Sequence, residues 1–425
     1  MATTALRREV EFVSPTRQRV MGLVFLIMAF WIWFFFSRSI PADTVTTFGM
    51  TPGGFQPKLP DWVLPTQLTL NLLAGIAAIL GIIQLVREGG FRRRTNLVLA
   101  IVSGIFIFAF LVWAAAGKSL NLAGLLTSTL LKAVPLTLGA LSGILCERAG
   151  VVNIAIEGMM LMGAMVGALI GSLTGNLWMG VLAAVVSGGI LGIIHGVLSI
   201  KYKTNQIISG TVINIFSFGF TAYISAKFMQ QFQYLNNPGI FPPRAIPGLS
   251  QIPFIGPILF NNNMFVYAMF LFLVILHVAL YYTRWGLRHR SVGEHPKAAD
   301  TLGINVFRTR YMAVLLGGMM AGFAGAYFTL GSVGRFDEFM TAGRGFIALA
   351  AMIFGNWNPF GAFGAGLLFG FADSLASKLA ILGSRIPSEF LLMAPYIATM
   401  IVLAGVVGRG QMPAADGTPY EKESV

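Results

Sequence analysis

Three ionisable residues, Lys132, Glu157 and Asp373, lie inside long apolar stretches of this sequence. An ionisable side chain at membrane depth is costly, so it usually faces other protein or a water-filled cavity. Such groups can bind protons or ions, or they can line the route of a polar solute. Structural roles remain open as well, because Glu157 can be paired inside the protein and Lys132 can extend toward the membrane surface.

Polar amides form a second set of candidates. A neutral polar solute needs a mostly apolar route with a few hydrogen-bonding groups. We therefore select as candidate substrate-pathway residues Asn153, Glu157, Asn205, Asn214 and Asn356. Hydrogen bonding between helices is the alternative role of each asparagine, and it is the more common one.

The sequence contains no pattern for catalysis or for metal binding. Gly117-Lys118-Ser119 matches the end of a phosphate-binding loop, but Val112 stands where that loop requires a glycine. None of the four histidines is spaced as a metal-binding pair. We therefore predict no catalytic residue, no metal site and no cofactor bound by this chain. Energy for any transport must come from an ion gradient or from another subunit.

The composition is that of a membrane protein. Of 425 residues, 56% are hydrophobic and only 11% are charged, whereas soluble domains have about 25% charged residues. The net charge of +13 comes from short basic clusters between apolar runs, which favours cytoplasmic loops over nucleic-acid binding. The single cysteine, Cys146, excludes an internal disulfide.

Apolar runs of about 20 residues can cross a bilayer as helices. They predict an all-α, polytopic helical membrane protein with about 12 transmembrane segments, 10–12 being possible. The predicted spans are 20–36, 66–86, 97–117, 120–145, 152–173, 177–200, 206–226, 264–283, 311–330, 344–356, 359–380 and 389–408. The run 344–356 is short enough to be a partial span. Spacings of glycine such as Gly163-xxx-Gly167 and Gly318-xxx-Gly322 predict close helix packing.

Basic residues predict the orientation of the chain. With the N-terminus in the cytoplasm, about 19 of the 29 basic residues fall on the cytoplasmic side, as the positive-inside rule expects. An even number of spans places the C-terminus there too. We expect extra N-terminal transmembrane helices in residues 1–120, a transport core in 121–408, and a disordered cytoplasmic tail in 409–425.

The cytoplasmic loop 284–310 contains a charged, soluble-looking segment between two spans. Pro296 suits the first turn of a short helix. Gly303 can end that helix. The pattern predicts a compact helical knob, which can dock against a cytoplasmic partner.

Three stretches, Ser142–Met160, Val292–Ile304 and Thr341–Pro359, resemble the permease subunits of bacterial ABC importers. This family serves branched-chain amino acids, ribose-type sugars and nucleosides, and the nucleoside-type permeases look most similar. The order and spacing of the stretches match over roughly residues 125–405. Residues 1–120 are only weakly similar to the family.

The resemblance implies a non-enzymatic permease subunit, multi-pass in the plasma or inner membrane, that forms the pathway for a small polar solute, most consistent with a nucleoside. It implies an ABC ATPase partner that carries ATP and Mg²⁺, a second related permease in a heterodimer, and a periplasmic or lipid-anchored substrate-binding protein. It also implies coupling to the ATPase through loop 284–310, at the residues Val292, Gly293, Glu294, Pro296, Ala298, Ala299, Leu302 and Gly303.

Other functions stay open at this point. A ribose-type sugar permease shares the same architecture. A gradient-driven secondary transporter can use Lys132, Glu157 and Asp373 as proton or ion sites. A membrane enzyme is disfavoured because the sequence contains no catalytic pattern.

Overall fold

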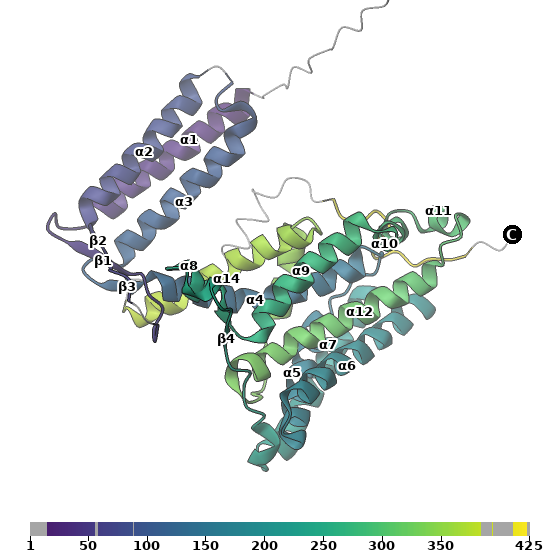
Figure 1. The fold of residues 1–425 in the computed structure, drawn as a ribbon. Helices are drawn as coiled ribbons and strands as arrows, with labels where there is room; N and C mark the ends of the chain where they lie inside the picture. The colour runs from purple at the N-terminus through teal and green to yellow at the C-terminus, as the bar shows by residue number, and fades with distance from the viewer. Residues whose placement is uncertain (1–14, 56–57, 88, 384–392, 394–410, 423–425) are drawn as a thin grey trace, which may run out of the picture. The chain divides into compact units, whose positions relative to one another are not determined.

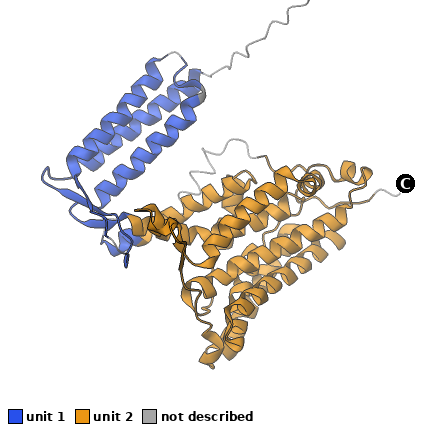
Figure 2. Cartoon of the chain, in the orientation of Figure 1, with its two compact units in different colours: residues 1–122, 378–387 blue, residues 123–377, 388–425 orange. Residues whose placement is uncertain are grey.

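The structure is a computed structural model that describes residues 15–55, 58–87, 89–383, 393 and 411–422. The chain forms two compact units (Figure 2), one of residues 1–122 and 378–387 and the other of residues 123–377 and 388–425. The observed division after residue 122 lies close to the expected boundary after residue 120.

The first unit is a three-helix bundle joined to a small sheet (Figure 1). Its helical segments are α1 (Pro15–Trp31), η1 (Ile32–Ser37), α2 (Thr66–Val86), η2 (Arg92–Arg94) and α3 (Thr95–Ala114). Its strands, in the spatial order β2-β1-β3, are β1 (Val45–Gly49), β2 (Trp62–Pro65) and β3 (Ser119–Asn121). β1 is antiparallel to β2, with Val45 opposite Pro65, and parallel to β3. Phe25, Ala77 and Val102 pack together inside the bundle.

The second unit contains most or all of each remaining helix. The long helices are α4 (Leu122–Glu147), α5 (Ile156–Thr174), α6 (Leu177–Gly196), α7 (Gln206–Ile224), α9 (Met264–Tyr282), α12 (Val306–Ala326) and α14 (Pro359–Ile381). The short helices are α8 (Ile255–Leu259), α10 (Arg284–Glu294), α11 (Pro296–Thr301) and α13 (Arg344–Phe354). Other short helical segments are η3 (Val197–Lys201), η4 (Ser225–Met229), η5 (Gln233–Asn236), η6 (Leu249–Gln251) and η7 (Tyr327–Val333). The short strands β4 (Arg244–Ala245) and β5 (Asn261–Asn262) pair antiparallel.

Ten helices within the described ranges are long and apolar enough to cross a membrane. They correspond to ten of the twelve predicted spans and confirm a polytopic, helical membrane protein. The run 344–356 forms only the 11-residue helix α13. At 1.5 Å per residue this helix is about 16 Å long, so it crosses only part of a hydrocarbon core of about 30 Å. The predicted span 389–408 lies outside the described residues.

One span begins earlier than its hydropathy predicts. The sequence places it at 311–330, whereas α12 and η7 together run from Val306 to Val333. Arg310 therefore lies inside the helix, and it is only 1% exposed. Its Nη1 donates a hydrogen bond to the carbonyl oxygen of Thr418 at 2.9 Å. The helix tolerates this arginine because the C-terminal segment covers it. Hydropathy along the chain does not indicate such a contact between distant segments.

Glycines bring the backbones of α5, α6 and α12 into direct contact. A Cβ atom on Gly163 of α5 would lie 2.5 Å from the carbonyl oxygen of Gly322 in α12. A Cβ atom on Gly188 of α6 would lie 2.2 Å from the carbonyl oxygen of Gly318. Neither position has room for a side chain, so the predicted packing role of the Gly163 and Gly318-xxx-Gly322 spacings is confirmed.

Loops predicted on opposite sides of the membrane gather at opposite ends of the second unit. At one end, His289 Nε2 lies 2.8 Å from the carbonyl oxygen of Leu145, which joins α10 to the end of α4. At the other end, the Asn236 side chain exchanges two hydrogen bonds with the backbone of Phe336. Figure 1 shows α10 and α11 together at one end of the long helices. This separation agrees with the alternation derived from the basic residues.

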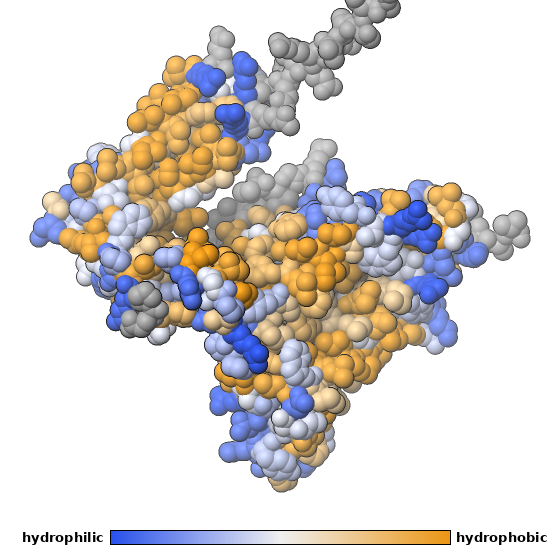
Figure 3. All heavy atoms as spheres, in the orientation of Figure 1, coloured by the Kyte–Doolittle hydropathy of each residue, from blue (hydrophilic) through white to orange (hydrophobic). Residues whose placement is uncertain are grey.

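Exposed apolar side chains cover the faces of the long helices (Figure 3). Examples are Leu182, Val186 and Ile190 on α6, and Leu271 and Val274 on α9. Apolar surfaces of this extent mark contact with a membrane or with a partner. Together with the ten apolar helices, they define the lipid-facing surface of a multi-pass membrane protein.

Candidate functional site

The loop 284–304 folds into a helical knob, which consists of α10, α11 and the turn to Ile304 (Figure 1). His295 Nδ1 accepts a hydrogen bond from the N–H of Ala298 at 3.1 Å and so caps α11. Pro296 occupies the start of that helix. Gly303 follows it with a φ of +80°, a conformation that favours glycine. The short helix predicted between Pro296 and Gly303 is confirmed.

Three of the eight predicted coupling residues face the interior of the protein. Val292 is fully buried, and Ala299 is 2% exposed. Gly293 is also buried. A Cβ atom on Gly293 would lie 2.3 Å from the carbonyl oxygen of Arg148. These residues therefore attach the knob to the rest of the second unit.

The other predicted coupling residues form the outer surface of the knob. Leu302 is 81% exposed, an unusual position for a leucine outside the spans. Glu294, Ala298 and Gly303 are also exposed, and Pro296 is half-buried. An exposed leucine beside small residues is suited to contact with another protein.

Residues 411–422 form a strap that lies against the knob, which differs from the disordered tail expected for 409–425. The N–H of Ala415 donates to the carbonyl oxygen of Gly293 at 2.9 Å. The N–H of Ala414 donates to Glu294 Oε2 at 3.2 Å. Tyr420 is only 6% exposed and packs in one apolar cluster with Val292, Ala299 and Val306. The polar composition of the tail gives no indication of this packing, because the contacts are made by its backbone groups and by one aromatic ring.

Two ionisable groups are buried around the knob. Burial raises the pKa of Asp416 in the strap to about 7, against the attraction of the Arg310 guanidinium. Burial also lowers the pKa of His289 in α10 to about 4. His289 is therefore neutral near pH 7, and its Nε2–H donates to the carbonyl oxygen of Leu145. The hydrogen bond that joins α10 of the knob to the end of α4 is therefore donated by a neutral histidine.

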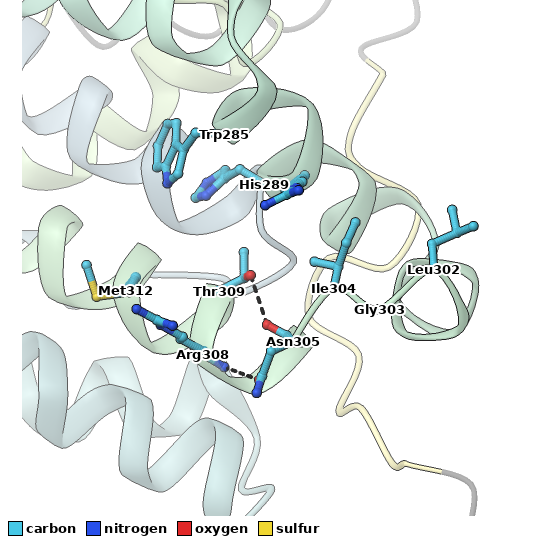
Figure 4. A pocket seen from close by; sticks show the side chains of 10 residues that line it. Trp285, His289, Leu302, Gly303, Ile304, Asn305, Arg308, Thr309 and Met312 are labelled. Atoms are coloured by element: carbon cyan, nitrogen blue, oxygen red, sulfur yellow. Dashed lines mark hydrogen bonds between the residues drawn. The ribbon is translucent and has the colours of Figure 1, made fainter.

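A pocket of about 590 Å³ lies beside the knob (Figure 4). It is lined by Trp285, Arg288, His289, Leu302, Gly303, Ile304, Asn305, Arg308, Thr309 and Met312. Asn305 connects neighbouring lining residues. Its Oδ1 accepts from the N–H of Arg308 at 2.9 Å, and its carbonyl oxygen accepts from Thr309 Oγ1 at 2.9 Å. Apolar and basic side chains together give the pocket the chemistry to receive a segment of a partner protein.

Glu157 joins the broken segment before α5 to the short helix α13. Its Oε1 accepts hydrogen bonds from Thr341 Oγ1 at 2.6 Å and from the N–H of Gly343 at 2.9 Å. Its Oε2 accepts from the N–H of Gly345. At the other end of α13, the indole N–H of Trp357 donates to Glu147 Oε2 at 2.6 Å. Two of the three stretches that carry the resemblance therefore meet in space.

The predicted pathway residues do not form one group. Asn153 and Asn214 lie close to the break before α5, together with Glu157. Asn153 is fully buried, and its Oδ1 accepts from the N–H of Ala155. Asn214 bridges α7 to the break, because it accepts from the N–H of Gly158 and donates to the carbonyl oxygen of Ile154.

The remaining two asparagines lie toward the end of the second unit that carries the knob. Asn205 is exposed and caps α7 by accepting from the N–H groups of Ile207 and Ile208. Asn356 Oδ1 accepts from the N–H of Gln411 in the strap at 2.8 Å. Each of the four asparagines therefore forms hydrogen bonds within this chain, which either connect segments or cap the start of a helix.

A cluster of charged side chains within the spans is more prominent than these amides. Lys132 and Asp373 form an ion pair at 3.0 Å, and Arg344 lies 3.8 Å from the other oxygen of Asp373. From the sequence, Lys132 and Asp373 were separate candidates, and neither their pairing nor the contribution of Arg344 was predicted. Opposite charges within two predicted spans were the available signal. Among the residues that the structure describes, no three His, Cys, Asp or Glu side chains gather as metal ligands.

Spanning helices packed through glycine, a polar break between α4 and α5, and a helical knob at their cytoplasmic ends define a multi-pass membrane permease. The chain belongs to the family of permease components of branched-chain amino acid transport systems, whose model matches residues 125–407. The match begins just inside the second unit, and the resemblance to ABC permeases is confirmed. The protein is located in the plasma membrane.

Several relatives are ABC transporter permeases. The guanosine ABC transporter permease protein NupQ of Bacillus subtilis is 40% identical over 304 residues, which cover 69% of this chain and 95% of NupQ. The nucleoside ABC transporter permease protein NupC of Lactococcus lactis is 39% identical over 313 residues, or 70% of this chain and 96% of NupC. The putative glucose ABC transporter permease protein TsgC13 of Haloferax volcanii is 36% identical over 253 residues, or 60% and 77%. No solved structure gives a significant match.

Proposed function

We propose that this chain is the transmembrane permease subunit of an ATP-driven nucleoside importer. The observation that carries the proposal is the 40% identity to the guanosine permease NupQ across 95% of its length. The similar match to the nucleoside permease NupC supports the same substrate class. A sugar is the second candidate substrate, because the putative glucose permease TsgC13 is 36% identical.

In this proposal the chain converts ATP hydrolysis by a separate subunit into movement of its spans. ATP and Mg²⁺ bind to that ATPase. The exposed surface around Leu302 and Gly303 contacts the ATPase, while Val292, Gly293 and Ala299 hold the knob to the second unit. Since α9 and α12 flank the knob directly, displacement of the knob moves both helices and changes access to the pathway.

Two further partners complete the proposed importer. A related second permease forms the other half of the pathway in a heterodimer. A periplasmic or lipid-anchored binding protein delivers the nucleoside at the outer end of the second unit. A polar pocket of about 710 Å³ at that end, with Gln230, Tyr234, Arg335 and Glu338 in its lining, supports such a contact.

Uptake of labelled guanosine and labelled ribose tests the proposal. The measurement compares cells with and without this gene, in backgrounds where the partner ATPase is intact or carries an inactive nucleotide-binding lysine. We expect guanosine uptake to require both proteins, and ribose uptake to be unaffected by either change.

The other outcomes separate the alternatives. Loss of ribose uptake alone would keep the ATP-driven permease and replace its substrate. Guanosine uptake that persists with the inactive ATPase, and that a protonophore abolishes, would favour a gradient-driven transporter instead.

A further inference from the structure

Three charged side chains from separate helices meet inside the second unit. Lys132 Nζ lies 3.0 Å from Asp373 Oδ1, and Arg344 Nη2 lies 3.8 Å from Asp373 Oδ2. Lys132 Nζ also donates to Ser377 Oγ at 2.7 Å. We call Lys132, Arg344 and Asp373 the ion triad. Asp373 is its centre, because it pairs with both cations.

The ion triad lies near the middle of the membrane. Lys132 is ten residues from the outer end of α4 at Leu122, or about 15 Å at 1.5 Å per residue. Asp373 lies fourteen residues from the cytoplasmic end of α14 at Pro359, or about 21 Å. Arg344 begins α13, whose other end contacts the cytoplasmic segment near Arg148. Three helices thus independently place a charge at similar depth.

Close packing of α4 against α14 sets the geometry of the pair. A Cβ atom on Gly370 of α14 would lie 2.7 Å from the carbonyl oxygen of Thr129 in α4. The two backbones therefore approach closely one turn before Lys132 and Asp373. The ion pair is held by its supporting helices, so it is preorganised for a ligand.

The ion triad is not sealed inside the protein. The side chains of Lys132, Arg344 and Asp373 are 25%, 31% and 33% exposed. By contrast, the exposed faces of α6 and α9 carry apolar side chains such as Ile190 and Leu271. Charged groups at mid-membrane face a water-filled cavity or other protein, because contact with lipid is costly. The exposed side of the triad is therefore turned toward water or toward other protein rather than toward lipid.

We propose that the ion triad lines the translocation route and recognises the ribose of a nucleoside, an inference that rests on the proposed function. The carboxylate of Asp373 accepts hydrogen bonds from the two neighbouring ribose hydroxyls, a pair that two carboxylate oxygens match. Lys132 and Arg344 balance the charge of Asp373. The three donors of Lys132 are used by Asp373 and Ser377, so Arg344 is the cation that donates to the oxygen atoms of the sugar. Ser377, which is exposed on the same face of α14, adds a hydroxyl.

Transport of guanosine and of 2′,3′-dideoxyguanosine by the complete importer, reconstituted in proteoliposomes, tests the proposal. The ratio of the two rates is compared between wild type, Asp373→Asn and the double variant Lys132→Met/Asp373→Asn. Selectivity of the binding protein cancels in this comparison, because all variants use the same one. The matched control Lys203→Met/Glu421→Gln removes an exposed ion pair outside the spans.

We expect the preference for guanosine to fall about tenfold in both variants, because a site built to bond hydroxyls discriminates strongly against their absence. The control keeps the wild-type preference. If Asp373→Asn fails to accumulate in the membrane, the charge-balanced double variant decides the result. An unchanged ratio in the variants that assemble would overturn the proposal and leave the triad as a structural contact. Absence of guanosine transport by the wild type would instead refute the nucleoside function itself.

Discussion

The carboxylate of Glu157 accepts a hydrogen bond from the backbone N–H of Gly345, 188 residues further along the chain. Thr341 and Gly343 donate to the same carboxylate. The first turn of a helix carries unpaired N–H groups and a partial positive charge, both of which an anionic acceptor satisfies. A Cβ atom on Gly345 would lie 2.5 Å from Glu157 Cα, so only glycine allows this approach. Glu157 therefore anchors the partial span α13 to the start of α5.

Replacement of Glu157 by Gln should destabilise the protein. The amide group can accept at only one atom and places a donor against backbone donors. We expect a loss of about 2 kcal/mol, which is typical of hydrogen bonds to charged groups. Thermal unfolding in detergent, with Glu338→Gln as the control at an exposed site, measures the effect. An unfolding temperature equal to that of the control would show that the carboxylate does not hold α13.

Replacement of Leu302 by Glu should separate the permease from its ATPase. Leu302 is 81% exposed on the knob, so the change does not disturb packing within the chain. Burial of the new charge in an interface would lower co-purification of the ATPase roughly tenfold. Leu249→Glu, an exposed leucine in the outer loop, is the matched control and should retain the ATPase. Normal co-purification with Leu302→Glu would place the docking surface elsewhere.

Replacement of Tyr420 by Ala should release the strap from the knob. The ring is buried among Val292, Ala299 and Val306, and its loss from such a site costs roughly 3 kcal/mol. We expect reduced guanosine uptake with normal membrane insertion, because the knob loses support. Glu421→Gln changes a neighbouring exposed residue and should leave uptake unchanged. Equal uptake by the two variants would mean that the strap does not support coupling.

The strap should be packed more stably at acidic pH. In the folded protein the pKa of Asp416 is about 7, above its usual value of 3.8, so the folded state binds a proton that the released strap does not. Stability from this group is therefore greatest below about pH 4 and is lost as pH rises through about 7. Arg310 and Glu147 are the ionisable groups that face it.

Hydrogen exchange of residues 411–422 at pH 5.5 and pH 8, corrected for the intrinsic exchange rate, measures this dependence. Protection should decrease at the higher pH in the wild type. In Asp416→Asn the side chain stays neutral, so protection should remain the same at both values. A wild type as insensitive to pH as the variant would exclude Asp416 as the responsible group.

Features coded within a short stretch of chain could be predicted from the sequence. The ten spans follow from continuous apolar runs, and the short helix of the knob follows from Pro296 and Gly303. Two predictions differ from the structure because they considered the charge of each segment only along the chain. Arg310 was placed in a loop although the strap covers it within α12. The polar strap itself was expected to be disordered, although the knob supplies partners for its backbone and for Tyr420.

Hydropathy, turn residues and motif order are properties of neighbouring residues, so the membrane class, the spans and the family could be predicted from the sequence alone. Which polar groups meet depends instead on how the helices pack in three dimensions. Lys132 pairs with Asp373 across 241 residues, and Glu157 with Gly345 across 188 residues. A buried or mid-membrane polar group is stable only when a partner satisfies it, and that partner is supplied by helix packing. The roles of Glu157 and of the ion triad therefore depend on contacts that the order of residues does not reveal.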